Sequence, residues 1–214
     1  MLKKNKFTLI LTSIMILLPV LIGLLLWDKL PDQIPSHWDI NGNVDSWSSK
    51  PFAVFGFPGI LLAIHWACIL VSSADPSRKN YHPKMIQLVL WICPVISMLL
   101  NALVYTQALE YHLAVETVIP LLVGVMFIIV GNLLPKCRQS YTMGIKLPWT
   151  LANEENWNKT HRLAGKLWVI GGVIIMSTAF LGEFWVMMGV MLVMVAVPTV
   201  YSYCLYRKQT AQEE

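Results

Sequence analysis

Few residues of this chain have types suited to acid–base chemistry, and they lie far apart in the sequence. His37 and Asp39 lie close together, but their surroundings supply neither a nucleophile nor a third metal ligand. Another polar group, Glu154–Glu155 with His161, follows much later in the chain. An enzyme is therefore the weakest hypothesis that these residues offer, and we predict no catalytic residue.

Metal binding is also disfavoured. Four residues alternate in the way of a calcium loop: Asp39, Asn41, Asn43 and Asp45. An EF-hand needs glycine at its sixth position and an acidic ligand at its twelfth, whereas here Gly42 is fourth and Lys50 twelfth. Four cysteines, Cys68, Cys93, Cys137 and Cys204, form no CxxC pair. We expect no metal, no cofactor and no disulfide, with Cys137 as a free thiol in a loop.

The composition indicates a membrane protein. Hydrophobic residues make up 56% of the 214 residues and charged residues only 13%, against about 25% charged residues in soluble domains. The net charge of +4 is too small to suggest nucleic acid as a direct partner.

Six apolar blocks are long enough to cross a bilayer, which takes about 20 residues in a helix. They cover residues 7–27, 52–72, 85–106, 113–134, 163–182 and 184–206. The first block is too long for a signal peptide and no cleavage site follows it. We therefore predict an all-α membrane protein with six transmembrane helices, divided into two three-helix regions at residues 1–112 and 113–214.

The distribution of cations predicts the orientation. Nearly all lysines and arginines lie in the N-terminus (Lys3, Lys4 and Lys6), loop 73–84, loop 135–162 and the C-terminal tail; the alternate loops hold only Lys29 and Lys50. The positive-inside rule then puts both termini on the cytoplasmic side of the cell membrane. Loop 28–51 is expected outside and loop 135–162 inside.

Polar residues inside the spans are candidate functional groups. His65 lies in the second span; the alternative is that it bonds to a serine or a carbonyl on a neighbouring helix. We interpret Asn132 as an interhelical hydrogen-bond group. No span carries a carboxylate near its middle, which argues against a proton- or sodium-coupled transporter, although a small transporter or flippase remains the alternative function.

Loop 28–51 is acidic and aromatic. Asn41–Gly42 predicts a two-residue turn of a short hairpin, because both residues tolerate positive φ. We predict that Trp38, Asp39, Asp45 and Trp47 face a ligand outside the cell. The alternative is that the loop only caps the helices.

Loop 135–162 combines turn residues with a helix start. Gly144 and Pro148 interrupt any regular element, and Asn153 is a good N-cap with Glu154 and Glu155 in the first turn. Trp157 and His161 then fall on one helical stripe. The alternative to recognition is a helix start that only anchors the bundle at the membrane interface.

The segment "GNLLPKCRQSYTMGIKLPWTLANEENWNKTHRLAGKL", residues 131–167, resembles the SdpI family of immunity proteins against the sporulation-delaying toxin. The matching positions are Gly131, Asn132, Pro135, Lys136, Tyr141, Gly144, Ile145, Pro148, Trp149, Thr150, Leu151, Glu155, Trp157, Thr160, His161, Gly165 and Lys166. The stretch "LPDQIPSHWDINGNVDSW" resembles the extracytoplasmic motif found in many members. Members commonly have Arg-Thr where this chain has Lys146–Leu147, and lysine lacks the planar fork of arginine.

The resemblance implies a membrane protein that protects its cell from a secreted antimicrobial peptide toxin. It also implies signalling, in which the protein holds an ArsR-type repressor at the membrane. The residues expected to carry signalling on the cytoplasmic side are Lys136, Tyr141, Gly144, Lys146, Pro148, Trp149, Thr150, Glu155, Trp157, Thr160, His161 and Gly165. The partners are then the toxin, the repressor and the lipid bilayer; the sequence leaves the toxin's identity and the oligomeric state open.

Overall fold

The computed structural model describes residues 5–111 and 113–213. Lys3 and Lys4, which the cation argument uses, lie outside these residues. The chain forms two compact units: residues 1–73 with 86–116 (the first unit), and residues 74–85 with 117–214 (the second unit). The second unit thus includes a short segment, residues 74–85, from the N-terminal half of the chain.

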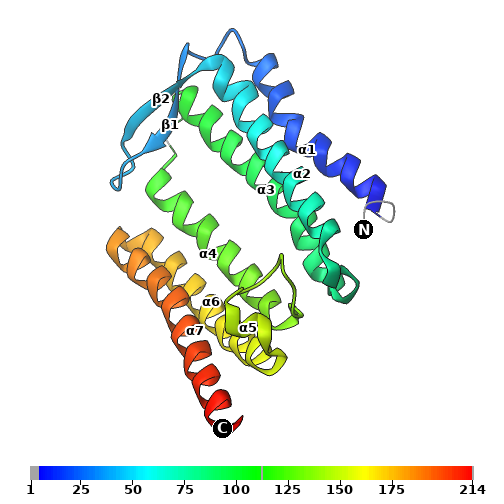
Figure 1. The fold of residues 1–214 in the computed structure, drawn as a ribbon. Helices are drawn as coiled ribbons and strands as arrows, with labels where there is room; N and C mark the ends of the chain where they lie inside the picture. Colours follow the sequence, from blue (N-terminus) through cyan, green and yellow to red (C-terminus); the bar gives the residue numbers. More distant parts are fainter. Residues whose placement is uncertain (1–4, 112, 214) are drawn as a thin grey trace. The chain divides into compact units, whose positions relative to one another are not determined.

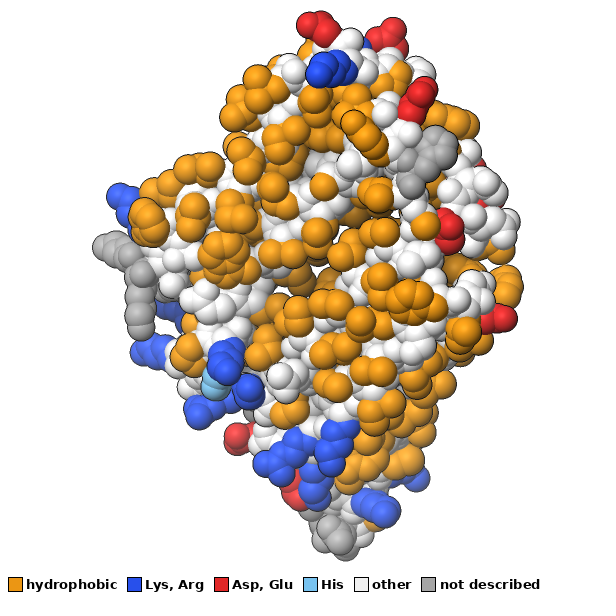
Figure 2. Space-filling view, turned by 180° about the vertical axis from the view of Figure 1, so that it is seen from behind, with side chains coloured by type: hydrophobic (Ala, Val, Ile, Leu, Met, Phe, Trp, Pro, Cys, Tyr) orange, Lys and Arg blue, Asp and Glu red, His pale blue; other side chains and the backbone are white. Residues whose placement is uncertain are grey.

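Six helices in the described residues are long and apolar enough to cross a membrane, which confirms the number and places predicted from the sequence (Figure 1). They are α1 (Lys6–Leu25), α2 (Phe57–Ala74, preceded by the π-helical turn η2, Phe52–Gly56), α3 (Pro83–Ala108), α4 (Val115–Leu133), α6 (Glu154–Leu181) and α7 (Phe184–Glu213). Their apolar side chains are widely exposed, as at Leu21, Phe180 and Leu192. Figure 2 shows hydrophobic side chains over most of the helical surface, as a lipid environment requires.

The first unit packs its helices through apolar contacts and a few buried hydrogen bonds. The hydroxyl of Ser97 on α3 donates to the carbonyl of Ile16 on α1 at 3.0 Å. The hydroxyl of Tyr105 donates to the carbonyl of Pro19, also at 3.0 Å. A Cβ on Gly23 would lie 2.6 Å from that hydroxyl and 2.8 Å from Val54, so α1 approaches its neighbours closely only because residue 23 is glycine.

The predicted hairpin is present in the first unit: β1 (Gln33–Trp38) pairs antiparallel with β2 (Val44–Ser49). The predicted two-residue turn is wrong. The Asp39 N–H donates to the Asn43 carbonyl at 2.8 Å and the Gly42 N–H to the Asp39 carbonyl at 3.1 Å. Gly42 has φ +80° and Asn41 does not have positive φ, so the connection is a three-residue loop closed by a glycine bulge.

In the second unit α4 and α6 meet at glycines. A Cβ on Gly165 would lie 2.8 Å from the carbonyl of Gly131, and one on Gly172 would lie 2.6 Å from the carbonyl of Gly124. Small residues allow this close backbone approach, which favours helix association in lipid. A tight turn joins α6 to α7, and Gly182 ends α6 there with φ +67°.

Short elements complete the second unit: η3 (Pro76–Asn80), η4 (Leu134–Lys136) and α5 (Pro148–Ala152). As predicted, Asn153 caps α6: its side-chain oxygen accepts the N–H of Asn156 at 2.9 Å. The helix therefore begins at Glu154 and continues without interruption into the fifth span.

Candidate functional site

The two acids predicted to face a ligand in the hairpin are engaged locally. The Asp39 carboxylate accepts the N–H groups of Asn41 at 2.9 Å and Asn43 at 2.8 Å. The bond from the Asn43 backbone is the main cause that holds the pKa of Asp39 below its usual range. Asp45 lies 2.6 Å from Nδ1 of His37, so the histidine pairs across the strands with Asp45 rather than with Asp39.

The two tryptophans of the hairpin differ in exposure. Trp38 is half-buried and packs on the cluster that contains Leu30 and Ile34. Trp47 is 55% exposed and lies opposite Pro35 in the strand register. Of the four predicted residues, Trp47 therefore offers the largest free apolar surface.

The base and the tip of the hairpin are both fixed within the first unit. At the base, the Lys50 ammonium lies 3.2 Å from the Asp32 carboxylate and donates to the Trp27 carbonyl at 3.3 Å. At the tip, a Cβ added to Gly42 would collide with the carboxylate of Glu116, in the first turn of α4. The hairpin is thus held at both ends.

In the segment 135–162, here called the motif segment, Trp157 and His161 form a buried core. Their rings stack with centroids 4.1 Å apart, and the side chains are 0% and 1% exposed. His161 donates from Nδ1 to the Trp157 carbonyl at 2.8 Å and accepts at Nε2 the N–H of Ile145 at 2.9 Å. The Trp157 indole donates to the Cys137 carbonyl at 2.7 Å. Both residues therefore hold the preceding chain against α6.

Gly144 allows this core to close. Its φ of +106° is one that other residues rarely adopt. A Cβ there would also lie 2.5 Å from His161 Nε2 and 2.7 Å from the Trp157 ring. Glycine is thus required for both conformation and space.

Three more motif residues make hydrogen bonds within the second unit: Thr150, Trp149 and Thr160. The Thr150 hydroxyl is fully buried, donates to the Ile145 carbonyl at 2.8 Å and accepts the Leu147 N–H at 2.9 Å. The Trp149 indole donates to the Ser202 hydroxyl on α7 at 2.9 Å. The buried Thr160 hydroxyl donates to the Asn156 side chain at 3.0 Å. These motif residues set the shape of the segment.

The remaining motif residues lie at or near the surface, except Gly165, which is buried against Gly131 and Pro135. Lys146 and Pro148 are exposed, Tyr141 is 64% exposed and Lys136 is half-buried. Glu155 forms an exposed ion pair with Lys159, one helical turn away, at 2.6 Å. The motif therefore has a buried part and an exposed part.

Cys137 is a free thiol in a loop, as predicted. The residue is buried beneath the motif segment, and burial raises the pKa of its thiol to about 12. Side chains satisfy the irregular backbone around Cys137. The Trp157 indole donates to the Cys137 carbonyl, and the Ser140 hydroxyl donates to the Met143 carbonyl.

Asp75 is a residue that the sequence analysis missed. It directly follows α2, is 3% exposed and accepts five hydrogen bonds from two segments. The donors are the Ser77 N–H and hydroxyl, the Tyr81 hydroxyl, the Tyr141 N–H and the Thr142 hydroxyl. Burial raises the pKa of Asp75, but these hydrogen bonds outweigh it and lower the pKa to about 2. Asp75 therefore joins the loop after α2 to the motif segment.

A signal for Asp75 was present in the sequence. Asp75–Pro76 is a helix N-cap followed by proline at the first helical position, which the structure uses to start η3. Nothing in the local pattern shows that the same carboxylate also holds Tyr141 and Thr142.

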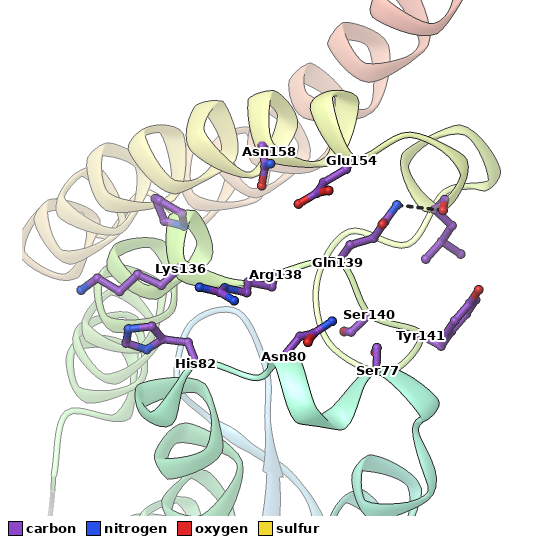
Figure 3. Close-up of a pocket in the computed structure, with 12 residues that line it drawn as sticks. Ser77, Asn80, His82, Lys136, Arg138, Gln139, Ser140, Tyr141, Glu154 and Asn158 are labelled. Atoms are coloured by element: carbon purple, nitrogen blue, oxygen red, sulfur yellow. Dashed lines mark hydrogen bonds between the residues drawn. The ribbon is translucent and has the colours of Figure 1, made fainter.

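A cavity of about 700 Å³ lies beside this junction, entirely within the second unit (Figure 3). It is lined by the chain after α2, by η4 and the following turn, and by the start of α6. The lining side chains are mostly polar and include His82, Lys136, Arg138, Glu154 and Asn158. The sequence analysis predicted only Lys136 and Tyr141 among the lining residues as functional.

The two polar candidates within the spans differ. His65 is fully buried and its Nε2 lies 3.1 Å from the Thr12 hydroxyl, which itself donates to the Leu9 carbonyl at 3.1 Å. The imidazole therefore donates to a neighbouring helix, in line with the structural alternative. The Asn132 side chain is exposed and has no hydrogen-bond partner within the described residues, so its role as an interhelical hydrogen-bond group stays a prediction.

Comparison with known proteins gives three findings. The model of the SdpI/YfhL protein family matches residues 136–202, and a domain of unknown function, DUF1648, matches residues 14–62. A relative described as "Immunity protein SdpI", from Bacillus subtilis (strain 168), is 29% identical over 96% of this chain and 97% of its own length. No solved structure matches the chain. The resemblance drawn from the sequence is confirmed.

Proposed function

This chain belongs to the SdpI/YfhL family, and from that premise we propose that it is an immunity protein of the bacterial cell membrane. It protects its cell against a secreted antimicrobial peptide toxin. The observation that carries the proposal is an alignment with an immunity protein along nearly the whole of both chains, which includes the hairpin and the motif segment.

The proposed orientation has both termini in the cytoplasm. The cation distribution assigns loop 73–84 and loop 135–162 to the same side of the membrane. The hydrogen bonds from Tyr141 and Thr142 to Asp75 support this assignment, because they join those two loops. The hairpin tip lies close to Glu116 in the first turn of α4, at the end of that helix that follows loop 107–112, and the same argument assigns both loops to the outside.

On the outer side we assign toxin contact to the hairpin. Trp47 supplies exposed apolar surface, and the exposed Asp45 beside His37 supplies polar groups. Trp38 and Asp39 stabilise the hairpin that carries this surface. Trp38 packs on the core, and Asp39 accepts a hydrogen bond that shapes the turn.

On the inner side we assign contact with an ArsR-type repressor to the exposed part of the motif. Tyr141, Lys146 and Pro148 present an aromatic ring, a cation and a rigid turn to solvent. The buried pair Trp157 and His161, which can pack in this way because residue 144 is glycine, keeps those three in place. Toxin and repressor are then coupled only if the bundle has two states with different affinity for each.

The test is cell survival under the cognate toxin, with and without this gene. In parallel, a reporter gene controlled by the repressor measures induction, that is, release from repression. Trp47→Ala should abolish resistance and induction together. The double variant Tyr141→Ala/Lys146→Gln should keep resistance and lose induction, because only the repressor surface changes. Resistance unaffected by loss of the gene would refute the immunity proposal.

Matched controls separate recognition from folding. Ser46→Ala lies on the same strand as Trp47 and should leave both outputs unchanged. Lys208→Gln removes an exposed cation from α7 and should leave induction intact. Membrane levels of every variant should equal those of the unmodified protein. Normal induction in the Tyr141/Lys146 variant would show that the repressor does not bind at these residues. It would not affect the immunity proposal.

A further inference from the structure

We propose that the cavity of about 700 Å³ in the second unit binds a phosphate group, carried by an anionic lipid headgroup or by a small organic phosphate. The proposal goes beyond the proposed immunity function. It rests on the unpaired cations, the free amide donors and the place of the cavity at the ends of the apolar helices.

The cations at the cavity have no protein counter-ion. Lys136 and Arg138 form no ion pair with any carboxylate in the described part of the chain. Figure 3 shows their side chains with that of His82 on one side of the cavity. A phosphate would receive charge-assisted hydrogen bonds from both, and the guanidinium of Arg138 can donate two at once.

His82 is oriented to act as a further donor. Its Nδ1 accepts the backbone N–H of Lys84 at 3.2 Å. The neutral ring therefore carries its proton on Nε2, the nitrogen left for a ligand. A histidine set in this way donates to an anion without first becoming charged.

Amide groups add uncharged donors. Asn80 and Asn158 line the cavity, and their side-chain amides make no hydrogen bond within residues 5–111 and 113–213. Gln139 and Ser77 line it too, but they are occupied: Gln139 donates to the carbonyls of Thr150 and Leu151, and the Ser77 hydroxyl to Asp75. The free donors are thus on opposite walls, in η3 and in α6.

The negative charge at the cavity is small. Glu154 is the only carboxylate among the lining residues. It lies in the first turn of α6, where the positive end of the helix dipole offsets part of its charge. The nearby Asp75 carboxylate is saturated by its five hydrogen bonds.

The lining residues come from the ends of candidate membrane spans. Lys136 ends the span that begins at Val115, His82 precedes Pro83 at the start of α3, and Glu154 opens α6. The ends of spanning helices lie at the level of the lipid headgroups. Basic pockets at this level are suited to anionic headgroups, and the polar lining excludes acyl chains.

The experiment uses the full chain purified in detergent, with binding measured by thermophoresis and Tm measured in parallel. Three probes are compared: dioctanoyl phosphatidylglycerol, dioctanoylglycerol without phosphate, and sn-glycerol 3-phosphate. We expect phosphatidylglycerol to bind and to raise the Tm, and dioctanoylglycerol to do neither. Equal binding by glycerol 3-phosphate would assign the site to a soluble phosphate, whereas binding by phosphatidylglycerol alone would assign it to a lipid headgroup.

Variants locate the binding. Lys136→Gln/Arg138→Gln should weaken the affinity at least about tenfold, as the loss of two charge-assisted bonds implies. Arg207→Gln/Lys208→Gln removes the same charge from exposed positions on α7 and should leave the affinity unchanged. Glu154→Gln removes the opposing charge and should tighten binding, an outcome that misfolding cannot produce.

The proposal is overturned by any of three results. These are unchanged phosphatidylglycerol affinity in the Lys136/Arg138 variant, equal weakening in the Arg207/Lys208 control, or binding of neither phosphate-bearing probe. Reporter output and toxin resistance are separate readouts, so failure of the immunity proposal leaves this result intact.

Discussion

In the hairpin of residues 33–49 a tryptophan and a histidine, Trp47 and His37, lie at the surface, whereas in the motif segment Trp157 and His161 are buried and the acids Glu154 and Glu155 stay exposed. Trp47 is 55% exposed and Trp157 is fully buried. His37 meets Asp45 in solvent, while His161 bonds to two backbone groups in a core. Similar residue types therefore build a core in the motif segment, whereas in the hairpin they remain available for the recognition that we propose.

The comparison also concerns backbone regularity. In the hairpin, strand pairing satisfies most of the backbone groups, apart from irregularities in the register on either side of His37, and it leaves the side chains free. Between η4 and α5 the motif segment has little regular structure, so side chains such as Thr150, Gln139 and His161 satisfy its backbone. Substitutions should consequently cost stability in the motif segment and recognition in the hairpin.

The largest effect is expected at Trp157. Trp157→Ala removes the ring that fills the core between the motif segment and α6 and leaves the Cys137 carbonyl without its donor. We expect a loss of about 3–5 kcal/mol in the free energy of unfolding, measured by denaturant unfolding in detergent micelles. A loss no larger than that of Trp47→Ala would contradict the contrast between the two regions.

Asp75→Asn is expected to have the next largest effect. Asparagine keeps the shape of the side chain but loses the charge that the five donors stabilise. We therefore expect the free energy of unfolding to fall by about 2–3 kcal/mol. Thermal unfolding measures the loss. Asp39→Asn in the hairpin is the matched control, and it should lower the stability less because Asp39 is only half-buried whereas Asp75 is buried.

The same carboxylate predicts a pH dependence. The pKa of Asp75 is lowered to about 2 in the folded chain, so its contribution is complete above the unfolded pKa of about 3.8. As the pH falls from there to about 2, roughly 2 kcal/mol of stability should be lost. An acid titration of unfolding should show this loss in the unmodified protein and not in Asp75→Asn.

Thiol labelling tests the difference in exposure between the hairpin and the motif segment. The Cys137 thiol should resist maleimide even in permeabilised cells, because it is buried and its pKa is raised to about 12. In a chain whose own cysteines are replaced, Ser46→Cys should label in intact cells and Lys146→Cys only after permeabilisation, since both positions are exposed. The reverse pattern would invert the proposed orientation.

The smallest effect on stability is expected at Trp47. Trp47→Ala should change the free energy of unfolding by about 0.5 kcal/mol or less while it abolishes toxin resistance. Trp47→Phe, which keeps an aromatic face, should retain part of the resistance in the same survival assay. A large loss of stability in Trp47→Ala would place the hairpin in the same class as the motif segment.

The helices and the hairpin could be predicted because their signals are local. Runs of apolar residues of membrane-spanning length predicted the six helices, and Asn153 predicted the start of α6. The turn at Gly42 was placed correctly, but its type depends on the register of the strands. The site was predicted less well, because the sequence shows which side chains are polar and not which backbone groups they satisfy.

Two residues illustrate this limit. Cys137 lies in a polar loop and looked accessible, yet Trp157 and Met143 from later in the chain enclose it. Asp75 lies in a short loop and looked unimportant, yet besides its local partners Ser77 and Tyr81 it accepts hydrogen bonds from Tyr141 and Thr142, far away in sequence. Both contacts are non-local, so no periodicity or local motif reports them.

The hydrogen bonds of Asp75 also constrain how the protein is made. Asp75 leaves the ribosome well before Tyr141 and Thr142, and domains generally fold as units while synthesis proceeds. Until the motif segment has been translated, the carboxylate therefore has only Ser77 and Tyr81 as hydrogen-bond donors. The second unit can close only after its helices from the C-terminal half have been inserted, so a stalled chain would expose an incomplete loop to the proteases that remove unfinished membrane proteins.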